Sequence, residues 1–444
     1  MGSAGTDSKP APVLPILISM VAGGFTGWLM REYGSSLGFD PLPLFDLVGT
    51  MFINLLKMII VPLILASVIT GVAALGSGPD LGRLGSKTLA FYVLTTLIAV
   101  LIALFLVNLI EPGVKDGQPV GDKLALSADA ATVTEGVKAR ANTSVLDTIK
   151  GVVPPNILEA AANTKLLAIV FFSVLFGFFL ARIEQPHQGT VMSFWQGIFQ
   201  IMMRMTGWVM MLAPVGVFAL IAKVVAVSGF EGAGPLLLFA GCVVLGLALY
   251  GFVALPILLA TAARVNPWRL YPAMAPALLT AFSTASSSAT LPLSLQCLEK
   301  RAKVSERIAG FVMPLGASVN HAGSALYECA AAMFIAQAYG LHLSFTTQFT
   351  VVILALITSM GIAGIPAASL VGIAIILGAV GLPAEAIGVL LVFDRLLDMC
   401  RTAINVLADA ACTVIVARLE GETGILPAGN GDTPHLLAKG DAPH

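Results

Sequence analysis

Apolar runs long enough to cross a lipid bilayer recur along the first 260 residues of this 444-residue chain. A helix needs about 20 apolar residues to cross the hydrocarbon core. Hydrophobic residues make up 57% of the sequence, charged residues 11%, and the mean hydropathy is +0.92, which is too apolar for a soluble protein of this length. We therefore predict an all-α polytopic membrane protein, with spans at about 13–30, 44–75, 88–110, 164–183, 196–226 and 234–262.

The charge and the cysteines exclude some classes of protein. A net charge of -1 gives no indication of a nucleic-acid partner. The five cysteines lie in apolar segments without paired spacing, which fits buried thiols better than disulfides or a zinc site. We expect no cofactor.

Basic residues between the apolar runs predict the orientation in the membrane. They fall on one side if the N-terminus with Lys9 does too, and the positive-inside rule then places both termini in the cytoplasm. These residues are Arg83, Lys87, Arg264, Arg269, Lys300, Arg301, Lys303 and Arg307.

Two apolar segments in the last third are interrupted at their midpoints, at 281–292 by serines and at 357–366 by Gly and Pro. Each fits a hairpin that enters the membrane, turns at its tip and leaves on the same side. Each is followed by a full-length segment with polar residues, first Asn320 to Glu328 and then Asp394 to Asp409. A kinked helix would explain one interruption, but two at corresponding positions favour a transporter site near the bilayer midplane.

The final apolar segment carries a polar stripe, consisting of Asp394, Asp398, Arg401, Asn405 and Asp409. On a helix these residues lie within an arc of roughly 80°. An ionised group left in hydrocarbon costs on the order of 3 kcal/mol, so the stripe must face protein, water, an ion or a ligand. A substrate site is the first interpretation.

Two other interpretations apply to charges in this segment. Asp398 and Arg401 could be a self-compensating pair at i, i+3. Asp394 and Arg395 are nearer the helix start, where we expect an interfacial or interdomain pair rather than ligands.

Several motifs in order resemble the dicarboxylate/amino acid:cation symporters, the glutamate transporter homologues. They are the serine-rich tip and the segments 313–328 (MPLGASVNHAGSALYE), 361–366 (GIAGIP), 398–409 (DMCRTAINVLAD), 56–63 (LKMIIVPL) and 213–220 (APVGVFAL). The resemblance covers roughly 10–420. It implies a homotrimer with an elevator mechanism, and eight transmembrane helices plus two re-entrant helical hairpins per chain.

The resemblance also implies a division of the chain. A cytoplasmic segment (1–12) precedes scaffold helices 1 and 2 (13–75), helix 3 of the transport domain (88–110), an extracytoplasmic loop (111–150) and scaffold helices 4 and 5 (151–226). The rest of the transport domain (234–420) holds helix 6, hairpin 1 (about 267–301), helix 7 (about 305–338), hairpin 2 (about 345–378) and helix 8 (about 386–418). A disordered cytoplasmic tail (421–444) follows.

For the substrate, the resemblance assigns Arg401 to a side-chain carboxylate, which a guanidinium can bind through two hydrogen bonds. Asp398 matches the position that binds an α-amino group, so glutamate or aspartate is preferred over succinate. The remaining expected pocket residues are Thr402, Asn405 and Ser324, with Ser287 and Ile365 at the hairpin tips.

For cations, the resemblance implies three sites. The first comprises Gly316, Asn320, Asn405 and Asp409; the second comprises backbone oxygens of Ser318, Ser359, Met360 and Ile362; the third comprises Tyr92, Thr95, Thr96 and Asn320. The third site normally includes an aspartate where this chain has Ala322, so we expect it to be weak or lost.

Glu328 matches the position of a protonatable glutamate in proton-coupled animal members of the family. Intramembrane Glu and His are recognised parts of proton relays, so Glu328 is the expected proton carrier and His321 a second candidate. The alternative for His321 is a neutral, hydrogen-bonded core residue. We predict proton coupling, with sodium as alternative or companion.

The predicted function is therefore uptake of acidic amino acids across a bacterial inner membrane, not catalysis. A C4-dicarboxylate symporter is the alternative within the family. From other classes, an intramembrane serine protease would use Ser287 and His321, and an anion channel would use Arg401 as its selectivity charge.

Overall fold

The computed structural model describes residues 13–33, 41–73, 79–124, 126, 133, 153–162, 166–228, 233–361 and 369–426. Most of these residues are helical. The strands β1 (Val114–Lys115) and β2 (Gln118–Pro119) form a small antiparallel hairpin. It is followed by the short helix η2 (Asp122–Leu124).

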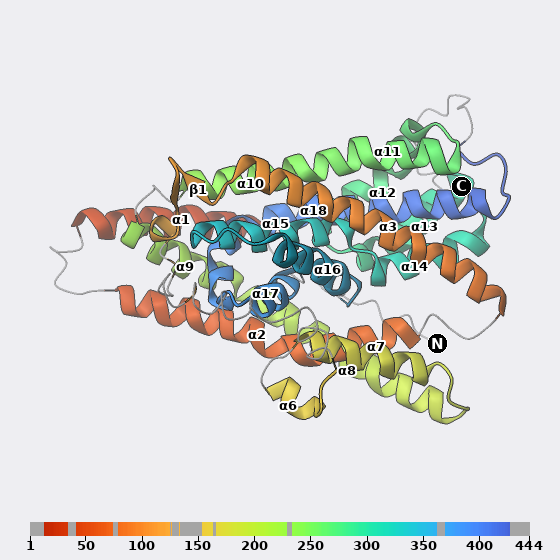
Figure 1. Ribbon diagram of the computed structural model, residues 1–444, viewed down its shortest axis with the longest axis horizontal. Helices are drawn as coiled ribbons and strands as arrows, with labels where there is room; N and C mark the ends of the chain where they lie inside the picture. Colours follow the sequence, from red (N-terminus) through yellow and green to blue (C-terminus); the bar gives the residue numbers. More distant parts are fainter. Residues whose placement is uncertain are drawn as a thin grey trace, which may run out of the picture.

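One group of helices contains α1 (Val13–Tyr33), α2 (Leu42–Ala73), α7 (Leu166–Leu180), α8 (His187–Met211) and α9 (Ala213–Ser228). In this group α1 packs on α9, and α2 packs on α7, α8 and α9. The short helix α6 (Ile157–Ala162) contacts α7. Glycine allows the close packing of α1, because a Cβ at Gly27 would lie 2.5 Å from the Ala222 carbonyl oxygen. Figure 1 shows α2, α7 and α8 along the lower side of the molecule.

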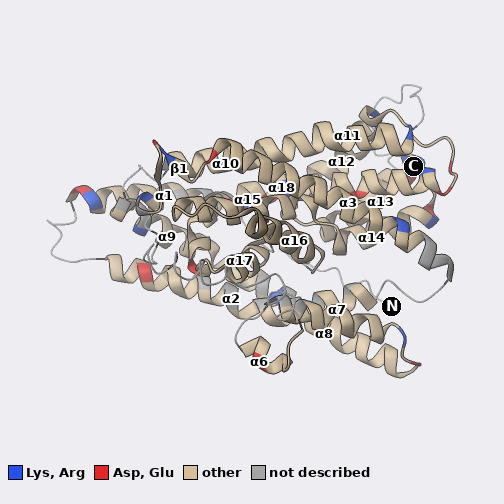
Figure 2. Cartoon of the chain, viewed as in Figure 1, with Lys and Arg blue, Asp and Glu red and all other residues tan. Residues whose placement is uncertain are grey.

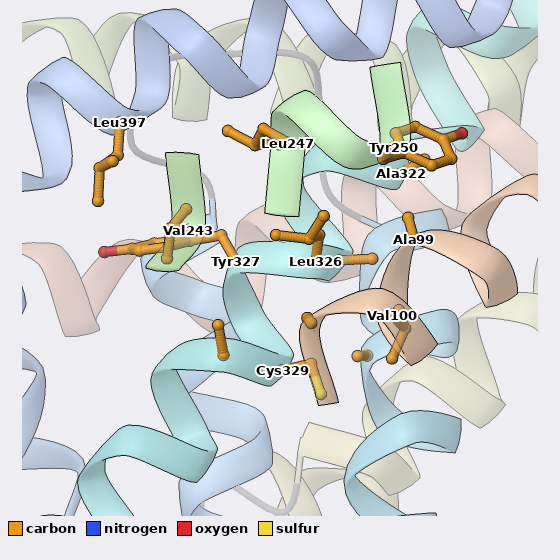
Figure 3. Packing of buried hydrophobic residues seen from close by; sticks show 14 of the residues in the cluster. Ala99, Val100, Val243, Leu247, Tyr250, Ala322, Leu326, Tyr327, Cys329 and Leu397 are labelled. Atoms are coloured by element: carbon orange, nitrogen blue, oxygen red, sulfur yellow. The ribbon is translucent and has the colours of Figure 1, made fainter. Parts of the chain in front are cut away.

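The second group surrounds α15 (Ala322–Ala338), which contacts α3 (Pro79–Ile110), α10 (Ala233–Leu249), α16, α17 and α18. Every residue of α15 except Gln337 is buried. Figure 3 shows Leu326 and Tyr327 near Val243 and Leu247 of α10, with residues of α3 close by. The core of this group is therefore built around α15.

Helix α10 continues to residue 263 through a π turn (Tyr250–Ala254), α11 (Leu255–Leu258) and a second π turn (Leu259–Ala263). Pro256 in α11 has no backbone N–H to donate, which explains a change of hydrogen-bond register here.

The serine-rich interruption is the tip between two packed helices, α12 (Leu270–Thr284) and α13 (Ser287–Lys300), which follow η6 (Pro267–Arg269). Ala285 ends α12 in the left-handed region, with φ +50°. The Ser286 side chain then accepts a hydrogen bond from the Ala289 N–H at 3.2 Å and caps α13. Both helices contact α18 (Ile387–Leu419).

The second interruption lies between α16 (Phe345–Gly361) and α17 (Ser369–Val380), which pack on each other and on α15. Residues 362–368 lie outside the described residues. A short turn, η7 (Ala384–Ala386), leads into α18.

The stretch at 305–338, where one continuous helix is predicted, holds two helices. They are α14 (Glu306–Val319) and α15, and Asn320 and His321 lie between them with non-helical backbone angles. The Asn320 side chain bonds with α3 and α18 instead of extending a regular helical surface. Hydropathy alone cannot detect a break of two residues.

Within the part of the chain that the structure describes, three stretches are long and apolar enough to cross a membrane, namely Leu84–Ile110, Gly234–Ala263 and Ala384–Leu419. A fourth is a bent pair, His187–Val209 and Ala213–Val227, if the two helices form one span broken by 52°. Pro214 explains the break, because it cannot donate the hydrogen bond that a continuing helix requires. The prediction of a helical, multi-pass membrane chain is confirmed.

The stretches coloured for charged residues in Figure 2 lie mostly toward the two ends of the molecule. At the right-hand end, residues 420–426 contact three segments that carry basic residues. The Lys87 Nζ atom lies 2.6 Å from a Glu420 oxygen, Arg269 donates to the Leu426 carbonyl at 3.2 Å, and the Leu426 N–H donates to the Ala302 carbonyl at 2.9 Å. Ile425 and Leu426 are buried, although the tail is expected to be disordered from 421.

Candidate functional site

The polar stripe of α18 faces the protein interior. All five of its members are buried, and Arg401 and Asp409 have no exposed surface. The helices that contact α18 include α3, α10, α12, α13, α14 and α15. The charged groups of this apolar segment are therefore shielded from lipid and have partners within the protein.

Arg401 is the centre of the first half of the stripe. Its Nη2 donates to Asp394 Oδ1 at 3.0 Å and to Asp398 Oδ1 at 2.9 Å. The guanidinium carbon lies 3.8 Å from the centre of the Tyr327 ring, within cation–π distance. Its Nε and Nη1 have no hydrogen-bond partner among the described residues. These two donor nitrogens are therefore available to an additional hydrogen-bond acceptor.

The pair Asp398–Arg401 at i, i+3 is present, but it is part of a larger cluster. The interfacial alternative for Asp394 and Arg395 is wrong, because both are buried and Asp394 bonds with Arg401. The interdomain alternative stays a prediction. Residues before them on α18, including Val389, are also buried, so the first turns of the helix are covered by protein.

Asn405 joins α18 to α15. Its Oδ1 accepts from the Gly323 N–H at 2.7 Å, and its Nδ2 donates to Ser324 Oγ at 3.2 Å. A Cβ at Gly323 would lie 2.9 Å from the Arg401 carbonyl oxygen, so the two helices approach closely only with glycine there. Thr402 donates to the Asp398 carbonyl at 2.8 Å.

Of the two residues expected at the hairpin tips, the structure describes only Ser287. Ser287 is buried and begins α13, which contacts α18. Ile365 lies outside the described residues. The structure therefore brings together Asp398, Arg401, Asn405 and Ser324, and puts Ser287 on an adjoining helix.

Residues of the first and third expected cation sites meet around Asp409. Asn320 Nδ2 donates to Asp409 Oδ1 at 2.8 Å, while Thr96 donates to Asn320 Oδ1 at 3.0 Å. A Cβ at Gly316 would lie 2.6 Å from the Asp409 carboxyl and 2.8 Å from the Tyr92 hydroxyl. Asp409 Oδ2 is buried and has no partner among the described residues. A buried carboxylate oxygen of this kind suits a cation or a proton.

Two hydroxyls of the third expected site donate to backbone carbonyls. Tyr92 donates to the Val312 carbonyl at 2.6 Å, and Thr95 donates to the Tyr92 carbonyl at 3.1 Å. Ala322 is fully buried and adds no side-chain oxygen, so the carboxylate that the resemblance implies for this site is missing.

The second expected site is described in part. Ser359 and Met360 are in the last turn of α16, and the Ser318 backbone is in the last turn of α14. Ile362 lies outside the described residues. His321 Nδ1 is 3.2 Å from the Ser359 carbonyl, which can only accept, so this nitrogen carries the proton.

Glu328 is fully buried in the middle of α15. Its Oε2 accepts from the Thr358 hydroxyl at 2.6 Å, and its Oε1 has no partner among the described residues.

Two contact residues were missed in the sequence. Asp394 was found on the polar stripe, because it shares a helix face with Arg401 at i, i+7, but its bond to Arg401 was not predicted. Thr358 and Gly372, which both touch the Glu328 carboxyl, carry no such signal, because they lie on other helices.

The sequence profile of the Sodium:dicarboxylate symporter family matches residues 13–419. The chain is 36% identical over 406 residues to the proton/glutamate-aspartate symporter of Escherichia coli (strain K12), covering 91% of this chain and 92% of that protein. It is 35% identical over 377 residues to the proton/sodium-glutamate symport protein of Bacillus caldotenax, covering 84% and 87%. It is 34% identical over 459 residues to human excitatory amino acid transporter 3, covering 92% and 85%.

Proposed function

Because the chain belongs to the sodium:dicarboxylate symporter family, we propose that it takes up glutamate or aspartate together with protons. The family consists of transporters, not enzymes, and the two bacterial relatives reported above are named for the coupling of glutamate or aspartate to protons or to protons and sodium. Substrate choice and coupling ion in this chain are our proposal.

The observation that carries the substrate proposal is the arrangement around Arg401. Two carboxylates, Asp394 and Asp398, lie beside the Arg401 guanidinium, and Arg395 Nη1 lies 3.9 Å from Asp398 Oδ2, so two negative and two positive groups balance in this cluster. A substrate α-amino group can be held at Asp398, and a substrate carboxylate by the unpartnered Nε and Nη1 of Arg401. We assign Thr402, Asn405, Ser324, Ser287 and Ile365 to the same pocket.

Glu328 supports proton coupling, because it is a fully buried carboxyl that bonds with a neutral hydroxyl. Ala322 supports it as well, since the third expected cation site lacks its carboxylate. The E. coli relative is named for the proton alone, whereas the Bacillus relative is named for proton and sodium. Sodium at Asp409 remains the alternative or an additional coupling ion.

We further propose the eight-helix, two-hairpin elevator architecture in a homotrimer. The helices α1, α2, α7, α8 and α9 pack mainly on one another rather than on the helices around α15, which supports a scaffold and a transport domain. The basic loops that meet at one end of the molecule support cytoplasmic termini in a bacterial inner membrane.

The competing functions fit this site less well. A C4-dicarboxylate would leave Asp398 without an amino group to bind. A serine protease would need His321 to bond with Ser287, but its Nδ1 faces the Ser359 carbonyl and its Nε2 has no partner among the described residues. An anion channel would gain nothing from carboxylates that bond to its selectivity arginine.

The test is uptake of labelled glutamate, aspartate and succinate into proteoliposomes under imposed gradients. A proton gradient alone should drive accumulation of glutamate or aspartate. Uptake that requires sodium and ignores pH would overturn proton coupling, and accumulation of succinate alone would overturn the substrate.

The Arg401→Cys variant tests the pocket. Loss of two charge-assisted hydrogen bonds, worth roughly 3 kcal/mol together at the least, should weaken glutamate binding by about 100-fold or more. Arg182→Cys is the control, because Arg182 is exposed and packs over Phe178. Unchanged glutamate affinity in Arg401→Cys would show that the pocket is misassigned.

A further inference from the structure

The carboxyl of Glu328 lies between the two helices that flank residues 362–368. From α16, the Thr358 hydroxyl donates to Oε2 at 2.6 Å. From α17, Gly372 provides space: a Cβ built there would come closer than 3.0 Å to Cδ and to both carboxyl oxygens. The carboxyl thus occupies the volume that a side chain at position 372 would fill.

The Thr358 hydroxyl has alternative acceptors within its own helix. Its Oγ1 lies 2.8 Å from the Leu354 carbonyl and 3.3 Å from the Ala355 carbonyl. A hydroxyl has one proton to donate and two lone pairs to accept with. When Glu328 is ionised, Thr358 can donate to it. When Glu328 is protonated, Glu328 can donate to Oγ1 while the Thr358 proton turns to Leu354.

Few charged or titratable groups among the described residues act on this carboxyl. Neither α16 nor α17 contains a titratable side chain, and α10 contains only Cys242. Arg401 of α18 interacts electrostatically with Glu328, and Cys329 is its neighbour on α15. On α3 the titratable residues are Asp80, Arg83, Lys87 and Tyr92, in its first half. Local hydrogen bonding and packing therefore control the carboxyl.

We propose that Thr358 and Gly372 are positioning residues, which hold the Glu328 carboxyl between α16 and α17 in both of its protonation states. The hydrogen bond between Thr358 Oγ1 and Glu328 Oε2 reverses its direction when the proton binds or leaves, so these two oxygens stay hydrogen-bonded to each other in both states. This inference rests on the proposed role of Glu328 as the proton carrier.

Substitution of Thr358 by Val should favour the protonated state. A hydrogen bond to an ionised group is about twice as strong as one between neutral groups, so the carboxylate loses more than the neutral acid does. We expect the midpoint of the pH profile of glutamate uptake to move to higher pH by about one unit. Thr358→Ser should restore the wild-type profile.

The control is Thr88→Val on α3, because Thr88 is equally buried and its hydroxyl bonds to Leu84 within its own helix. Its profile should stay at the wild-type midpoint. A Thr358→Val profile that matches wild type would overturn the inference. So would an equal shift from Thr358→Val in a Glu328→Gln background, where the proposed partner cannot titrate.

Infrared difference titration measures the protonation of the Glu328 carboxyl directly, with Glu328→Gln as the blank. It tests the positioning role of Thr358 independently of the proposed proton-coupled uptake. A midpoint that Thr358→Val leaves unmoved overturns the positioning role. A midpoint that moves, in a protein whose uptake ignores the proton gradient, supports the positioning role and overturns proton coupling instead.

The Gly372→Ala variant tests whether the Glu328 carboxyl needs the space that Gly372 leaves on α17. Gly378→Ala on the same helix is its control. A Cβ at Gly378 meets nothing within 4 Å. We expect Gly372→Ala to lower both uptake and Tm, Gly378→Ala to leave both near wild type, and Glu328→Ala to remove the Tm loss caused by Gly372→Ala. Equal tolerance of both alanines would overturn the role of Gly372.

Discussion

Asp394 and Asp398 both contact the same nitrogen of Arg401. The proposed difference between them is that only Asp398 binds the α-amino group of the substrate. We expect Asp398→Asn to weaken glutamate binding by about 10- to 100-fold, from the loss of a hydrogen bond between charged groups. Succinate lacks an amino group, so its competition with labelled glutamate should not weaken. Competition assays with both compounds measure this.

Asp394→Asn is the matched control, because it removes the other carboxylate beside Arg401 without touching the proposed amino site. It should affect glutamate less than Asp398→Asn does. Equal loss of succinate and glutamate binding in Asp398→Asn would mean that this aspartate serves only to orient Arg401.

At the level of residues, the sequence predicts which side chains share a face but not which atoms meet. The polar stripe on α18 is visible because helical periodicity stands out against an apolar background. The position of Asp394 near the start of α18 nevertheless favours an interfacial or interdomain pair with Arg395. The sequence cannot show that the first turns of α18 are buried, because the helices that cover them lie far away in the sequence. The contacts of Glu328 with Thr358 and Gly372 are hidden for the same reason.

Close approach between elements makes Gly316 of α14 a sensitive position. An alanine Cβ there would lie 2.6 Å from the Asp409 carboxyl, which must then move away from Asn320. Gly316→Ala should therefore reduce uptake by at least tenfold. Transport kinetics at saturating glutamate, with protein amount normalised, provide the measurement.

Gly310→Ala on the same helix is the control, because a Cβ there meets nothing within 4 Å. It should transport like the wild type. If both variants are equally active, the Asp409 cluster has no part in transport.

At the level of elements, local composition predicts turns better than breaks. The serine-rich tip could be placed because Ser286 can cap a helix and no apolar run crosses the tip. The break at Asn320 and His321 could not, because two residues hardly change the hydropathy of a long run. The bend at Pro214 was likewise read as one span, although Pro is a known helix breaker.

At the scale of the whole molecule, the proposed coupling requires that substrate and proton bind to one moving unit. Arg401 on α18 and Glu328 on α15 belong to adjacent, packed helices of the same group. Arg401 also interacts electrostatically with Glu328. Binding at the two places is therefore expected to be thermodynamically linked, and the linkage must be reciprocal.

The most direct measurement is substrate-driven acidification of proteoliposomes that contain an entrapped pH dye in sodium-free medium. External glutamate should acidify the lumen in the wild type and fail to do so in Glu328→Gln. Glutamate uptake without acidification, or acidification that persists in Glu328→Gln, would contradict proton coupling through Glu328.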